Sequence, residues 1–255
     1  MPPRSIDEVL SRLDRIIADA RRTDDPLGYF AALYRDVTAR VASTIEDGGF
    51  QDGPRMERLD VVFANRYFAA LDARGTAAGP PRAWQAAFAA ADRWRPLILQ
   101  HLLLGMNAHI NLDLGVAAVE TAPASGLQAL KPDFMRINQI LGAMIEAVQR
   151  RLARVSPWIG VLDRLGHGVD EAISNFSLAH ARRDAWAFAE RLAPLDPRAR
   201  RQVIAAKDRE TARRADAILR PGGLLFVPVL LCIRLRETDD VTAGIDALSR
   251  TSPAA

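Results

Sequence analysis

Two histidine–aspartate pairs carry the side chains in this sequence that are best suited to chemistry. His109 precedes Asp113 by four residues, and His180 precedes Asp184 by the same spacing. Residues four apart on an α-helix lie one turn apart on the same face, so each pair projects an imidazole and a carboxylate together. Two facing pairs would offer nitrogen and oxygen ligands to zinc, iron or manganese. We therefore expect these four side chains to be the ligands of a divalent metal.

The first pair lies in a run of mixed character. Residues 101–115 place two histidines, two asparagines and an aspartate in an otherwise apolar segment. A surface helix would keep its polar groups on one outward face, whereas here Asn107 and Asn111 fall nearly opposite His109. We expect a buried central helix at about 96–119. The residues expected to support the metal or to contact a substrate are His101, Asn107, Asn111 and Asp60.

A purely structural role accounts for the same residues. Histidine and aspartate four apart also form local hydrogen bonds or ion pairs on helices. Buried polar groups must find partners whether or not they do chemistry, so His109, Asp113 and the two asparagines would then form a closed polar network. The protein would be a non-catalytic helical scaffold or a small-molecule binding protein. Asp60 has three roles open to it: pairing with an arginine, orienting a histidine, or facing water.

Helical spacing of apolar residues recurs along the chain, and no convincing strand pattern appears. Ser5 followed by Glu8 fits a capping box at the start of the first helix. The spacing predicts one all-α domain over residues 1–255, a multi-helix bundle in which residues 121–131 form a loop and His167 lies on another. The expected helices cover residues 6–17, 30–45, 56–70, 84–95, 96–119, 133–155, 157–165, 169–193, 198–219 and 239–249.

Composition limits the classes of protein. The 255 residues are 49% hydrophobic, enough for a sizeable core. The net charge is only +3, and acidic residues are interspersed with the arginines, so we expect no nucleic-acid partner. Phosphate-binding loops, the dinucleotide-binding glycine pattern, the serine-hydrolase elbow and paired-cysteine zinc motifs do not occur.

The single cysteine and the apolar segments bear on location. Cys232 has no partner for an internal disulfide, and free buried cysteine is common in reducing compartments, so we expect a cytoplasmic protein. The N-terminus lacks the apolar core of a secretion signal, and the run Leu224–Leu235 is about half the ~20 residues that a spanning helix needs. No transmembrane segment is expected. Peripheral contact with an anionic membrane, through residues 198–219 and this apolar run, is a third interpretation, and the oligomeric state is left open.

The central run resembles the signature of an uncharacterised bacterial family, domain of unknown function 5995. The resemblance rests on Gly-Met-Asn-Ala-His-Ile-Asn-Leu-Asp-Leu-Gly at 105–115, preceded by Gln-His at 100–101. It extends to residues 63–67, to Asp133-Phe134 with Ile137-Asn138, and to 180–192, and so covers most of the chain. It implies an all-helical bacterial protein and carries no mechanism.

A more distant similarity bears on chemistry. Zinc-dependent phospholipase C and related single-strand nucleases carry Gly-x-x-x-His-x-x-x-Asp on one helix and a histidine–acid pair on another. The residues that match in type and order are Gly105, His109, Asp113, His180 and Asp184. The similarity implies a metal-bound water that hydrolyses a small ester or phosphoester. No Pro-x-His element follows Asp113, and Met1-Pro2 has no counterpart of the ligating N-terminal tryptophan. The expectation is therefore a mono- or dinuclear centre.

Overall fold

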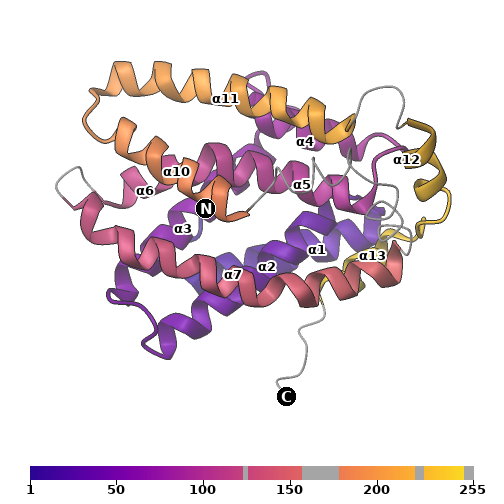
Figure 1. Ribbon diagram of the computed structural model, residues 1–255, viewed down its shortest axis with the longest axis horizontal. Coiled ribbons are helices and arrows are strands. Elements are labelled where there is room, and N and C mark those ends of the chain that lie inside the picture. Colours follow the sequence, from indigo (N-terminus) through magenta and orange to yellow (C-terminus); the bar gives the residue numbers. More distant parts are fainter. Residues whose placement is uncertain (123–125, 157–177, 222–226, 250–255) are drawn as a thin grey trace.

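The computed structural model describes residues 1–122, 126–156, 178–221 and 227–249. These residues form α-helices and one π-helical segment and contain no strand, which confirms the all-α prediction (Figure 1). In chain order the elements are α1 (Ile6–Thr23), α2 (Leu27–Glu46), α3 (Gly53–Asp72), α4 (Arg82–Ala91), α5 (Ile98–Ala108), η1 (His109–Leu114), α6 (Gly115–Thr121), α7 (Leu127–Val155), α10 (Leu178–Leu192), α11 (Pro197–Leu219), α12 (Val227–Arg234) and α13 (Val241–Ser249).

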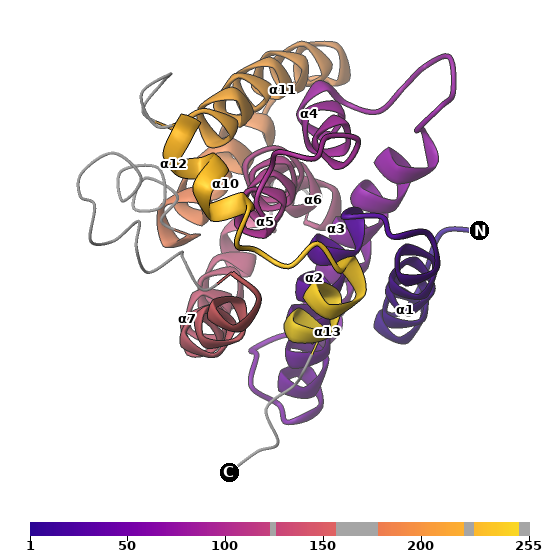
Figure 2. The same cartoon turned by 90° about the vertical axis from the view of Figure 1, so that its right-hand side faces the viewer.

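The central helix is made of α5, η1 and α6, which follow one another without a break. Figure 2 shows α5 and α6 near the middle of the bundle, with α4, α10, α11, α7, α2 and α3 around them. By length and composition, Ile98–Thr121 is the one described helix that qualifies as a membrane span, but 94% of its apolar window is buried within the protein. A transmembrane segment is therefore not indicated, and the helix at about 96–119 is confirmed as the buried centre of the fold.

The middle of this helix is wider than the regular α-helix that the spacing predicts. Over His109–Leu114 the backbone is π-helical, with hydrogen bonds that span five residues in place of four. Such single-turn bulges occur frequently at functional sites. Residue types do not reveal the shift, so sequence patterns missed it.

Several helix boundaries differ from the prediction. The long helix α7 begins at Leu127, inside the loop expected at 121–131, and it contains Pro132. Proline lacks the N–H that would bond to the carbonyl four residues earlier, here that of Gln128, yet the helix continues through it. The next residue, Asp133, accepts hydrogen bonds from the backbone N–H groups of Gln51 and Asp52 at 2.7 and 3.0 Å. It thus ties the α2–α3 connection to α7.

Other differences lie near the chain ends and gaps. Ser5 caps α1 by accepting from the Glu8 N–H, but the Glu8 carboxylate accepts from the N–H of Arg4 and not of Ser5, so the expected box is half formed. The helix expected at 84–95 ends at Ala91. Cys232, expected to be buried, is exposed on α12. The helix expected at 157–165, the loop with His167 and residues 169–177 lie outside the described residues.

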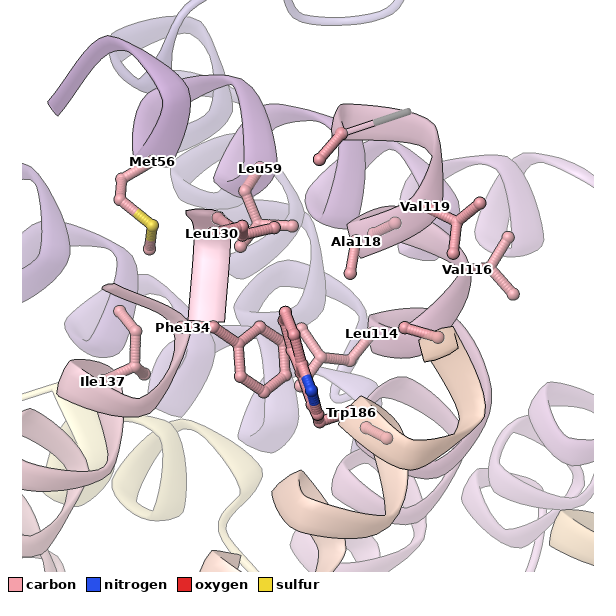
Figure 3. Packing of buried hydrophobic residues seen from close by; sticks show 14 of the residues in the cluster. Met56, Leu59, Leu114, Val116, Ala118, Val119, Leu130, Phe134, Ile137 and Trp186 are labelled. Carbon is pink, nitrogen blue, oxygen red and sulfur yellow. The ribbon is translucent and has the colours of Figure 1, made fainter. Parts of the chain in front are cut away.

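Apolar packing joins the central helix to α3, α7 and α10. Figure 3 shows Met56 and Leu59 from α3 near Leu130 and Phe134 from α7. The rings of Phe134 and Trp186 lie 4.9 Å apart between centroids, so α7 and α10 meet through aromatic side chains. This packing fixes α10 against one side of η1.

Candidate functional site

Asp113 is the centre of a buried polar cluster. The indole N–H of Trp84 donates to its Oδ2 at 2.8 Å, and Nε of Arg66 lies 3.1 Å from its Oδ1. Nδ1 of His109 lies 3.4 Å from Oδ2, so the four-residue spacing brings this pair together as expected. Asp113 is only 1% exposed, and the Arg66 guanidinium balances its charge and also contacts Glu120 at the surface. The carboxylate is therefore held by three helices.

His109 is fixed by aromatic rings. Phe63 stacks on its imidazole with 3.5 Å between centroids, and the ring of Tyr34 meets it edge-on at 4.7 Å. Burial lowers the pKa of His109, and the neighbouring Asp113 opposes this shift. The neutral imidazole can donate its Nδ1–H to Asp113, which leaves Nε2 as an acceptor. This Nε2 is buried and has no hydrogen-bond partner.

The second pair forms as well, but on the surface. Nε2 of His180 lies 3.6 Å from Oδ2 of Asp184 on α10, and the His180 side chain is 60% exposed. Across the described ranges, no three His, Cys, Asp or Glu side chains gather as the ligands of one ion would. The structure therefore does not bring the two histidine–aspartate pairs together. His180 lies on the exposed face of α10, whereas His109 of η1 is buried in the core.

The two asparagines bind a neighbouring helix. Asn111 donates to Asn107 at 2.9 Å, and Asn107 donates to the backbone carbonyl of Thr211 on α11, also at 2.9 Å. Arg214 reaches Asn111 at 3.4 Å. As the spacing predicts, they lie on a face away from His109, and their hydrogen bonds attach the central helix to α11.

His101 lies near the other end of the central helix, with its ring 5.8 Å from that of Tyr29. Burial, with a smaller contribution from Arg234, lowers the pKa of His101 to about 4. The side chain is therefore a neutral core residue, and it borders a cavity of about 10 Å³, enough for roughly one water molecule.

Asp60 does not face bulk water. It is 9% exposed, and burial, with a smaller contribution from Glu57, raises the pKa of its carboxyl to about 7. Its Oδ2 has no hydrogen-bond partner among the described residues. Together with Nε2 of His109, it is a buried polar atom that the described fold leaves unsatisfied. Such groups cost about 1–3 kcal/mol each when nothing pairs with them.

Tyr34, Asp60 and His109 line a large apolar cavity. Its volume is about 460 Å³, within the range of small-molecule sites, and it lies among α2, α3, the central helix, α7 and α10. The polar residues in its wall are Tyr34, Asp60, His109, Gln149 and Arg182, and the rest are apolar. The apolar lining residues are Phe30, Leu33, Val37, Val41, Met56, Leu59, Phe63, Leu99, Leu102, Leu103, Met106, Ile110, Leu114, Ile137, Leu141, Met144, Val148, Leu152, Leu178 and Ala179.

Arg182 is the cation of this cavity. Its Nε donates to Oδ1 of Asn138 at 2.7 Å, its Nη2 donates to the Phe134 carbonyl at 2.5 Å, and the guanidinium lies 4.6 Å from the centre of the Phe134 ring. The side chain is 4% exposed, and no carboxylate of the described residues pairs with it. Burial lowers the pKa of Arg182 to about 9, so it stays charged at neutral pH.

Sequence reasoning missed the partners that come from other helices. Spacing along a sequence relates only residues of the same helix. The partners that it missed lie on other helices: Tyr34, Arg66, Trp84 and Arg182. One signal was available. Phe63 and Tyr67 lie three and seven residues after Asp60, which places Asp60 on the apolar stripe of α3 and so inside the protein.

The comparisons place the chain in a family whose function is unknown. Residues 6–221 match the Family of unknown function (DUF5995), and the chain belongs to this family. Neither the curated proteins nor the solved structures gave a match. The distant similarity to zinc-dependent phospholipase C and related nucleases is thus unsupported by any relative.

Proposed function

We propose that this protein binds an apolar small molecule inside the helical bundle. The observation that carries the proposal is the cavity of about 460 Å³, walled by apolar side chains from five parts of the fold. Protein interiors are close-packed and have few voids larger than a water molecule. When an apolar ligand fills a void of this size lined by leucine, valine and methionine, burial of apolar surface makes binding favourable.

Gln149 of α7 is the one described lining residue that is exposed. Lining residues of several helices are partly exposed, such as Val148 of α7 and Val37 of α2, whereas Leu33 of α2 and Leu102 of α5 are buried. A ligand would enter beside Gln149 and extend toward these buried leucines.

A neutral dye whose fluorescence rises in apolar surroundings, N-phenylnaphthylamine, tests the proposal. We expect it to bind the protein with a stoichiometry of one, and Val37→Trp, which adds an indole at the cavity wall, to abolish binding. Val203→Trp is the matched control, because Val203 is also half-buried but lies on α11 outside the cavity. Circular dichroism verifies folding, with Val148→Trp as a second blocking variant. Dye binding that survives both blocking variants, or its absence from the native protein, contradicts the proposal.

Metal-dependent hydrolysis of a small ester or phosphoester at the two histidine–aspartate pairs is the rival proposal. It requires His109 and His180 to share an ion, and the described residues do not gather in that way. Metal analysis of protein purified without a histidine tag separates the two. Stoichiometric metal that disappears in His109→Ala would favour hydrolysis.

A further inference from the structure

We infer that the ligand of this cavity is an amphiphile with an anionic carboxylate head, such as a fatty acid, whose head pairs with Arg182. The inference rests on the proposed function and names the class of molecule that the cavity takes. The observation behind it is a buried guanidinium in a largely apolar wall, which has neutral hydrogen-bond partners and, among the described residues, no carboxylate partner.

The setting of Arg182 is that of an anion-binding residue. Its two contacts, to Asn138 and to the backbone of Phe134, orient the guanidinium, and no carboxylate in the described part of the chain compensates its charge. Arginine almost never lies fully buried without a partner of opposite charge. A carboxylate fits a guanidinium with paired N–H···O bonds, which are about twice as strong as those between neutral groups.

The position of Arg182 in the cavity suits a head group. It lies on α10 one turn after Leu178, and both residues line the wall that faces α7. Arg182 contacts Phe134 and Asn138 of α7, whereas the buried Leu33 of α2 and Leu102 of α5 line other parts of the wall. A carboxylate held at Arg182 would place the hydrocarbon tail against the buried leucines of α2 and α5.

None of the other polar residues described in the wall is a cation at neutral pH. Asp60 is acidic, Tyr34 and Gln149 are uncharged, and burial lowers the pKa of His109. An amine head would meet the guanidinium of Arg182 as a like charge, which disfavours an amine at this part of the cavity. Charge complementarity therefore selects a carboxylate over an amine or an alcohol.

Displacement of N-phenylnaphthylamine by dodecanoate and by dodecanol at neutral pH tests the inference. The two competitors share the same chain and differ in the head. We expect dodecanoate to displace the dye at a concentration about tenfold lower than dodecanol. In Arg182→Gln this preference should vanish through weaker binding of dodecanoate alone, and Arg182→Lys should restore part of it.

Arg183→Gln is the matched control, since Arg183 is the exposed neighbour on the same helix. Equal displacement by the two competitors in the native protein, or an equal loss in the Arg182 and Arg183 variants, overturns the carboxylate assignment even if the dye binds. Failure of the dye and dodecanol to bind at all overturns the proposed function instead. If Arg182→Gln does not fold, the preference of the native protein and its value in Arg182→Lys decide the question.

Discussion

At the scale of single residues, Asp113 shows how one buried carboxylate joins several helices. Its oxygens bind Trp84, Arg66 and His109, so loss of its charge leaves a guanidinium and an indole N–H with poorer partners. We expect Asp113→Asn to lower the free energy of unfolding by about 3 kcal/mol, because breaking a buried pair costs more than the pair itself contributes. Urea denaturation followed by circular dichroism measures the change.

Glu120 provides the comparison for this prediction. It pairs with the same Arg66 at 3.2 Å, but its side chain is 48% exposed. Exposed ion pairs contribute little, so Glu120→Gln should change stability by less than about 1 kcal/mol. Similar losses in both variants would show that burial of Asp113 has no energetic consequence.

The spacing of residues on one helix was enough to predict both histidine–aspartate contacts and the asparagine pair. The spacing could not predict which face of each helix is buried. His109 faces the core because η1 is covered on all sides, whereas His180 faces solvent because α10 packs with Ala185, Phe188 and Ala189 toward its neighbours. The same motif therefore gives a buried pair and an exposed pair, and only tertiary packing distinguishes them.

At the scale of the elements, the junction between η1 and α6 depends on the absence of a side chain. A Cβ at Gly115 would lie 2.7 Å from the backbone carbonyl oxygen of Ala185 and 2.7 Å from Cδ1 of Phe188. A carbonyl of a neighbouring helix cannot move aside cheaply. Gly115→Ala should therefore destabilise the protein by about 1–3 kcal/mol through displacement of α10.

Gly142 is the matched glycine in α7. A Cβ there meets nothing within 4 Å, so Gly142→Ala should stabilise the helix by roughly 0.5–1 kcal/mol. Thermal or urea unfolding of both variants gives the comparison. The two changes in the free energy of unfolding should have opposite signs. A neutral or stabilising Gly115→Ala would mean that α6 and α10 can separate enough to admit a methyl group at little cost.

Element boundaries were predictable where local chemistry sets them. The Ser5 cap of α1 forms as predicted, because its side-chain oxygen accepts from the N–H of Glu8. The start of α7 was predicted too late, because residues 121–131 were expected to form a loop, whereas the helix begins at Leu127 and continues through Pro132. The cavity was missed because it belongs to no single element: it arises where five parts of the chain surround a space that their side chains do not fill.

At the scale of the whole molecule, buried titratable groups make stability depend on pH in opposing ways. Burial raises the pKa of Asp60 from 3.8 to about 7, so the native state keeps a proton that the unfolded chain has released, and stability falls as pH rises through this window. Burial lowers the pKa of His101 from 6.5 to about 4. There the unfolded chain binds the extra proton, and stability rises with pH between these values.

Asp60→Asn removes the first contribution and keeps the second. A shift of about three pKa units at ~1.36 kcal/mol per unit is worth up to about 4 kcal/mol, so the variant should gain stability over the native protein at pH 8 and little or none at pH 4. Urea unfolding at both pH values measures the difference between the two gains, which cancels the cost of the amide itself. For Asp19→Asn on the exposed face of α1, the difference between the stability changes at pH 8 and pH 4 should be near zero. A gain that is the same at pH 4 and pH 8 would mean that the Asp60 carboxyl is solvated, and with it that the cavity wall formed by α3 is open to water.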